Sequence, residues 1–183
     1  MNALLMILIL IILFIVIFAI WYISTSNKLN VATVKIEEAL SGIDVALSKR
    51  YDVLTKLIDV VKAYAKHEKE TLFEVIKLRK DMSLQEKGKA NAAMDETLKQ
   101  ISMVAESYPE LKSNENYKTL QQAIIDVEEH LQAARRLYNA NVSLYNQQLV
   151  SFPTSMVASN KHLTKKDFFE AEDIKKNDVK IDL

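Results

Sequence analysis

The sequence has no cysteine and very little glycine or proline. Its 183 residues include only 2 glycines and 2 prolines. Without cysteine there are no disulfides, thiolate nucleophiles or sulfur ligands for a metal. Phosphate-binding loops, dinucleotide fingerprints and nucleophile elbows need glycines at fixed spacings that are not found here. Two glycines and two prolines also leave little material for hairpins and bulges, so the composition indicates a chain that is nearly all helix.

A net charge of one sign is also absent. The 24 lysines and arginines are balanced by 24 aspartates and glutamates, so no bulk charge attracts nucleic acid or an acidic substrate. We therefore expect no nucleic-acid partner, and we expect binding partners to be selected by shape.

The polar residues show no catalytic or metal-binding pattern. The three histidines, His67, His130 and His162, lie in different segments. Neither the His-Glu-x-x-His spacing of zinc proteases nor the Glu-x-x-His spacing of di-iron bundles occurs. We therefore expect no metal, no cofactor, no catalytic residue and no enzymatic activity.

One long apolar run stands near the N-terminus. It covers 21 residues from Ala3 to Ile23 without a charge, and as a helix it would be about 31 Å long, enough to cross a hydrocarbon core. Trp21 and Tyr22 lie where an aromatic belt would meet the lipid surface. A transmembrane anchor over residues 1–27 is the preferred interpretation. A cleaved signal peptide is the alternative, although the run is longer than a usual signal core and no basic residue precedes it.

The basic residues around this run give a weak indication of orientation. None precedes it, whereas Lys28 and Lys35 follow it. By the positive-inside rule this slightly favours a cytoplasmic bundle. The sequence thus predicts a single-pass protein of the cell membrane, with the side of the bundle left open.

Apolar residues spaced three and four apart predict one long helix from Lys28 to Met82. The stripe consists of Ile36, Leu40, Ile43, Leu47, Leu54, Leu57, Val61, Tyr64, Val75 and Leu78. Gly88 predicts a turn or a loosened segment near Glu86–Lys89, followed by a second, shorter helix to about Glu106.

A loop is predicted around Pro109, because proline disfavours helix for the preceding residue, and the helix after it should start at Ser113 or Asn114, with Asn116 as a further option. The next helix should end at Phe152-Pro153, with a short helix after it and a charged tail over residues 164–183. The apolar stripe of the helix that ends at Phe152-Pro153 consists of Tyr117, Leu120, Ile124, Val127, Leu131, Ala134, Tyr138, Val142, Tyr145 and Leu149.

Two charged residues occupy apolar stripe positions. Arg50 falls between Leu47 and Leu54, and Glu68 follows Val61. They are too far apart on one helix to pair, and an unpaired buried charge costs several kcal/mol. If the helices are antiparallel, Glu128 is the predicted partner of Arg50, and Arg135 that of Glu68. The alternative is that both long side chains reach solvent at the edge of the stripe.

A Tyr-Asn pair occurs twice, seven residues apart, so Tyr138 and Tyr145 lie on one helix face with Asn139 and Asn146 beside them. We interpret the rings as core residues and the amides as groups that bond across to backbone or to a facing helix. A binding site is the alternative. We define the polar seam as the candidate interaction residues Arg50, Glu68, Glu128, Arg135, Tyr138, Asn139, Tyr145 and Asn146.

Five segments in this order resemble the LemA family of bacterial membrane-anchored helical proteins. They are IDVALSKRYDVL from Ile43, VKAYAKHEKETL from Val61, AESYPELKSNENY from Ala105, AARRLYNANVSLYN from Ala133 and FPTSMVA from Phe152. The resemblance implies an all-α fold: an N-terminal anchor, then an antiparallel, up-and-down bundle of about four helices, the first very long, over residues 28–163. Thr55, Lys56 and Ala63 stand where the family commonly has Pro-Asn and Gly, so we expect a straighter first helix.

The resemblance also implies no established catalytic activity and hints at an adaptor role. Our hypothesis is a membrane-anchored helical interaction or scaffold protein, with envelope or membrane proteins as partners and a possible homo-oligomer. The alternative is a ligand-binding or catalytic bundle with a polar pocket around Arg50, Glu68 and Arg135.

Overall fold

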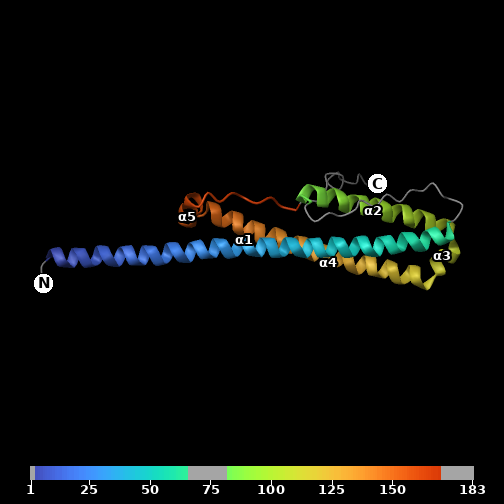
Figure 1. The fold of residues 1–183 in the computed structure, drawn as a ribbon, viewed down its shortest axis with the longest axis horizontal. Helices are drawn as coiled ribbons and strands as arrows, with labels where there is room; N and C mark the ends of the chain where they lie inside the picture. The colour runs from blue at the N-terminus through green and yellow to red at the C-terminus, as the bar shows by residue number, and fades with distance from the viewer. Residues whose placement is uncertain (1–2, 66–81, 170–183) are drawn as a thin grey trace, which may run out of the picture. The chain divides into compact units, whose positions relative to one another are not determined.

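The structure, a computed structural model, describes residues 3–65 and 82–169. Within these ranges it contains five α-helices and no strand: α1 (Ala3–Tyr64), α2 (Leu84–Ser107), α3 (Pro109–Ser113), α4 (Glu115–Val150) and α5 (Thr154–Asn160) (Figure 1). The predicted all-α class with a very long first helix is confirmed.

The helix α1 is 62 residues long and runs from the apolar segment into the bundle without interruption. It continues through Thr55 and Lys56, as expected where the family's proline is missing. Most of the predicted stripe is buried, and Leu40 and Tyr64 are half-buried. The predicted continuation to Met82, with Val75 and Leu78, lies largely outside the described residues.

The predicted turn at Glu86–Lys89 is wrong, because Gly88 lies inside α2. A capping box starts this helix earlier: Ser83 Oγ accepts from Glu86 N at 3.2 Å, and Glu86 Oε2 accepts from Ser83 N at 2.7 Å. A capping box satisfies two otherwise unpaired N–H groups. Buried Met94 and Ile101 then hold the helix in place. One glycine costs only about 1 kcal/mol in a helix, which these contacts outweigh.

The predicted loop around Pro109 contains the five-residue helix α3, with Pro109 in its first turn. Proline is favoured there because its fixed φ suits the helix and its missing N–H would be unpaired anyway. Asn114 starts α4 as predicted, since its Oδ1 accepts from Tyr117 N at 3.1 Å. The helix α5 confirms the predicted short helix after Pro153.

The chain divides into two compact bodies. Among the described residues, we call 3–39 with 138–168 the anchor body, and 40–65 and 82–137 with Phe169 the core body. In the anchor body, Leu29, Val157 and Ala158 form a small core, with Trp21 and Tyr22 packed against it. The boundaries expected from the sequence, between anchor and bundle at residue 27 and between bundle and tail at residue 163, are not tested by this division and stay a prediction.

The core body has the larger hydrophobic cluster. It joins residues of α1, α2, α3 and α4: Leu54, Leu57, Ile58, Val61, Met94, Ile101, Ala105, Leu111, Tyr117 and Ile124. Burial of so many apolar side chains is the main stabilising contribution to the bundle.

Candidate functional site

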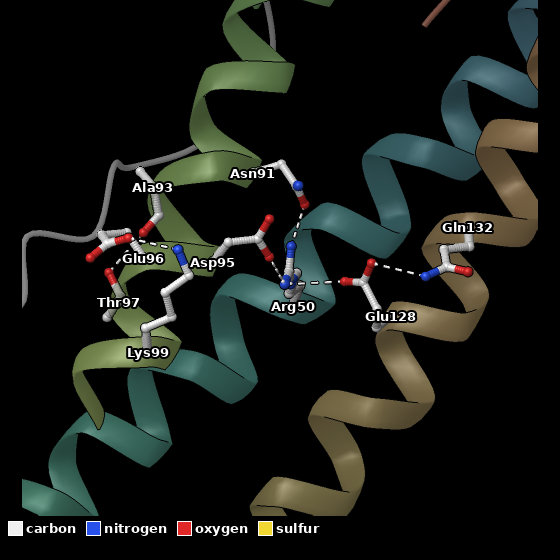
Figure 2. A network of polar contacts seen from close by, with 9 residues as sticks. All are labelled: Arg50, Asn91, Ala93, Asp95, Glu96, Thr97, Lys99, Glu128 and Gln132. Carbon is white, nitrogen blue, oxygen red and sulfur yellow. Dashed lines mark hydrogen bonds and ion pairs between the residues drawn. The ribbon is translucent and has the colours of Figure 1, made fainter. Parts of the chain in front are cut away.

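Arg50 lies at the centre of a polar cluster in the core body (Figure 2). Its side chain is only 2% exposed. Nη2 lies 2.6 Å from Asp95 Oδ1 and 3.1 Å from Glu128 Oε2, while Nη1 donates to Asn91 Oδ1. The ion pair between Arg50 and Glu128 predicted from the stripe positions is present, and the interpretation that Arg50 reaches solvent is wrong.

Two partners of Arg50 were missed by sequence reasoning. Asn91 and Asp95 come from α2 and are four residues apart, so they lie on one face of that helix. Asn91 is itself buried. The available signal was their position beside the apolar residues Ala90 and Met94, but the predicted turn at Gly88 obscured this helix face.

Arg135 belongs to the same electrostatic environment. Burial lowers the pKa of Arg135, Glu128 opposes that shift, and Arg50 adds to it. Its guanidinium carbon lies 5.0 Å from the centre of the Phe169 ring, a cation–π contact. Glu68, its predicted partner, lies outside the described residues. Two arginines therefore share the field of two carboxylates, Asp95 and Glu128.

The first Tyr-Asn pair of α4 meets the extended segment after α5. The Tyr138 hydroxyl donates to the backbone oxygen of Asp167 at 3.0 Å, and the side chain is 3% exposed. Burial raises the pKa of Tyr138, and the nearby Asp167 carboxylate raises it further. Asn139 is half-buried on the same helix.

The second Tyr-Asn pair lies two turns further along α4. Asn146 Nδ2 donates to Lys166 O at 2.9 Å, and Asn146 Oδ1 accepts from Lys166 N at 2.9 Å. One amide thus satisfies both backbone groups of one residue, as a neighbouring strand would. Tyr145 is buried at 1% exposure. These contacts agree with the interpretation that the amides of the Tyr-Asn pairs bond across to backbone groups.

The polar seam therefore falls into two groups. Arg50, Glu128 and Arg135 lie in the core body, whereas Tyr138, Asn139, Tyr145 and Asn146 lie in the anchor body. In the described part of the chain no cluster of three or more His, Asp or Glu side chains could hold a metal. The geometry can fix helix and segment positions, and whether these residues also bind a partner stays a prediction.

The N-terminal part of α1 is long and apolar enough to cross a membrane. Its apolar side chains from Leu4 to Phe18 are all roughly half or more exposed. It is a candidate membrane anchor.

Comparisons with known proteins show what this chain is similar to. The LemA family model matches residues 39–183. The Protein LemA of Metamycoplasma hominis is 28% identical over 168 residues, covering 89% of this chain and 77% of that protein. Magnetosome proteins MamQ 1 and MamQ 2 of Paramagnetospirillum magneticum are each 25% identical over 81 residues, covering 44% of this chain and 30% of theirs.

The family match extends over most of the chain and includes the Arg50 cluster and both Tyr-Asn pairs, whose positions the fold now explains. It begins at residue 39, after the apolar segment, and continues through α5. The chain belongs to the LemA family.

Proposed function

We propose that the protein is a single-pass, membrane-anchored interaction or scaffold protein that acts without catalysis. The observation that carries this proposal is the continuity of α1, one helix of 62 residues from the apolar run into the bundle. Within the anchor body, a continuous helix holds the residues up to Ala39 in a fixed position relative to the apolar run, whereas a flexible linker would not. A protein built this way can present a bundle surface at the membrane.

The core body offers apolar surface for such partners. Val45 on α1, Met103 on α2 and Ile125 on α4 are 67%, 68% and 52% exposed. Single exposed apolar residues are common on any protein, so each is a place to search for a partner and not a binding site in itself.

The burial of Arg50 favours this proposal over the alternative of a ligand pocket. Its two terminal nitrogens already contact Asn91, Asp95 and Glu128. A ligand would have to displace a carboxylate from a guanidinium that is 2% exposed, and separating a buried ion pair costs several kcal/mol.

A photo-crosslinking experiment in cells tests the proposal. A photoreactive amino acid replaces Met103 or Ile125 in the full chain, and the captured proteins are identified by mass spectrometry. The matched control carries the same group at Lys99, whose side chain is 72% exposed but polar. A second control lacks residues 3–23.

We expect specific membrane or envelope proteins, or a second copy of the chain, at Met103 or Ile125 and only with the intact anchor. Capture that is the same at Lys99, or the same without residues 3–23, would contradict an anchored scaffold that uses Met103 or Ile125 as a contact.

The side of the membrane is tested separately, because it decides which partners are available. Lys99→Cys introduces the only thiol of the chain at an exposed position away from the proposed contacts. We expect a membrane-impermeant maleimide to label it only after the cells are broken, in line with Lys28 and Lys35 following the span. Labelling in intact cells would place the bundle outside the cytoplasm.

A further inference from the structure

The turn between α4 and α5 exposes an unusual amount of apolar side chain. Val150, Phe152 and Met156 are 62%, 82% and 54% exposed, and Pro153 between them is exposed as well. We call these four residues the apolar turn. Exposed apolar side chains that lie close together indicate a contact surface more strongly than isolated ones do.

The register of the anchor body places the apolar turn at the end of the apolar run. Asn141 Nδ2 donates to Lys35 O at 3.1 Å, while Leu149 packs against the cluster that contains Leu29. Position therefore increases along α4 as it decreases along α1, so the two helices are antiparallel here. Counted from Asn141 at equal rise, Val150 comes level with Ser26, and the turn that follows comes level with Ile23.

Direct contacts hold α5 and the residue after it beside this part of α1. Asn160 Nδ2 donates to the Tyr22 hydroxyl at 2.6 Å. Lys161 Nζ donates to Ser26 Oγ at 2.9 Å and to Asn30 Oδ1 at 2.7 Å. Figure 1 likewise shows α5 beside the early part of α1.

The small core of the anchor body adds packing to these hydrogen bonds. Val157 and Ala158 are buried against Leu29, with Trp21 and Tyr22 at the edge of the cluster. The apolar turn is thus fixed relative to the two aromatic residues at the end of the run.

The charges around this end suit a lipid surface. No carboxylate occurs in residues 1–36 or 130–166. The anchor body contains five lysines, at positions 28, 35, 161, 165 and 166, against three carboxylates, at positions 37, 38 and 167. Although the whole chain is neutral, this body would not be repelled by anionic headgroups.

We propose that the apolar turn inserts into the interface of the same bilayer that holds α1. The inference rests on the proposed anchoring of α1. With the span ending near Ile23, the turn reaches the headgroup layer, where Phe152 and Met156 can bury apolar surface while the backbone stays hydrated. A second contact beside the span restrains the tilt and rotation of α1, and so sets how the anchor body meets the membrane.

The proposal is tested by site-directed fluorescence on the full chain in phosphatidylcholine vesicles. The cysteine-free sequence allows single substitutions, Phe152→Cys and Met156→Cys, each labelled with a polarity-sensitive maleimide dye. Phe14→Cys, within the apolar run, reports anchoring. Val34→Cys is the matched control: it is 59% exposed and about 16 Å beyond Ile23 along α1, above the headgroup layer. Quenching is measured with nitroxide-labelled lipid.

We expect lipid nitroxides to reduce the emission from Phe14→Cys, Phe152→Cys and Met156→Cys, and to leave that from Val34→Cys unchanged. Quenching at Phe14→Cys without quenching at either turn position would overturn the inference while anchoring stands. Absence of quenching at Phe14→Cys would overturn the proposed anchoring, and the inference with it.

A second copy of the chain covering the apolar turn would give a different result. The dye at Phe152→Cys would then shift to the blue without being quenched by lipid nitroxides, and the shift would weaken as the protein is diluted in lipid. That outcome would also overturn the inference.

Discussion

The two bodies of the chain use polar groups in different ways. The core body buries an arginine among two carboxylates and an amide that come from two other helices. In the anchor body, the neutral Tyr138 hydroxyl and Asn146 amide hold backbone groups of the segment after α5. A buried charge is costly without its partners, whereas each neutral bond contributes little by itself. The comparison therefore predicts that substitutions of polar residues reduce stability strongly and cooperatively in the core body, but weakly and locally in the anchor body.

The largest effect is expected for Arg50→Ala. It leaves Asp95 and Glu128 facing each other without their common cation, and removal of one partner of a buried pair costs about 3–5 kcal/mol. Because the two carboxylates are 27% and 30% exposed, water can reach them and we expect about 3 kcal/mol. Chemical unfolding of the full chain in detergent micelles, followed by circular dichroism, measures this change.

The matched control for Arg50→Ala is Lys99→Ala, which breaks an ion pair whose side chains are 72% and 60% exposed. Exposed pairs contribute about 0–1 kcal/mol, so this variant should unfold almost like the parent. If Arg50→Ala kept its stability and lost partner capture, the charge cluster would be a binding pocket and the contrast between the bodies would disappear.

In the anchor body, Asn146→Ala should open only the segment it holds. It removes both bonds to the Lys166 backbone, and at this half-buried position we expect about 1 kcal/mol. Hydrogen exchange measures the effect locally, as faster exchange of the Lys166 amide with unchanged protection in α2. The neighbouring Gln147→Ala, on an exposed side chain, is the control. Equal loss of protection across the core body would contradict local opening.

Tyr138→Phe is expected to cost about 1 kcal/mol, because it removes one hydrogen bond to the Asp167 backbone. The effect should depend on pH. Since the pKa of Tyr138 is raised in the folded chain, the folded state holds more protons than the unfolded state above the usual tyrosine pKa of about 10. The contribution of the Tyr138 hydroxyl to the free energy of unfolding is thus fully present below that pH. It is lost as the pH rises through the pKa of Tyr138 in the folded chain.

The measurement is the difference in unfolding free energy between the parent and Tyr138→Phe as a function of pH. It should be constant up to about pH 10 and shrink above it. A difference that stays constant through that range would mean that the hydroxyl titrates equally in both states, and would contradict the raised pKa of Tyr138 in the folded chain.

Sequence periodicity predicts most of this fold because apolar spacing directly encodes which helix face is buried. Ile43, Leu47, Leu54 and Val61 are buried as the stripe predicts. Arg50 could be identified because a charge interrupting that stripe must find a partner. The seven-residue spacing located both Tyr-Asn pairs on one helix face but not what they hold, since Asp167 and Lys166 contribute only backbone groups, and backbone groups carry no residue-specific signal.

The turn predicted at Gly88 is wrong because the sequence signal is local. Glycine weakens a helix locally, and a local signal cannot report how strongly the rest of the helix is held. The Ser83 and Glu86 pattern of a capping box stands in the sequence just before the glycine and would have placed the helix start correctly. Locating the start there also brings Asn91 and Asp95 onto one helix face, toward Arg50.

Gly88→Ala is the smallest of the predicted effects, and it is opposite in sign. A Cβ at this position would meet nothing within 4 Å, and alanine is favoured over glycine in a helix interior by about 0.5–1 kcal/mol. We expect the variant to be more stable by that amount in the same unfolding experiment. Gly42→Ala is the matched variant for this measurement of stability. It also lies in a helix of the core body, and its added Cβ would come 3.9 Å from the Cβ of Ala134, an ordinary contact. Destabilisation by Gly88→Ala would mean that this segment is not helical and that the Arg50 cluster lacks its α2 side.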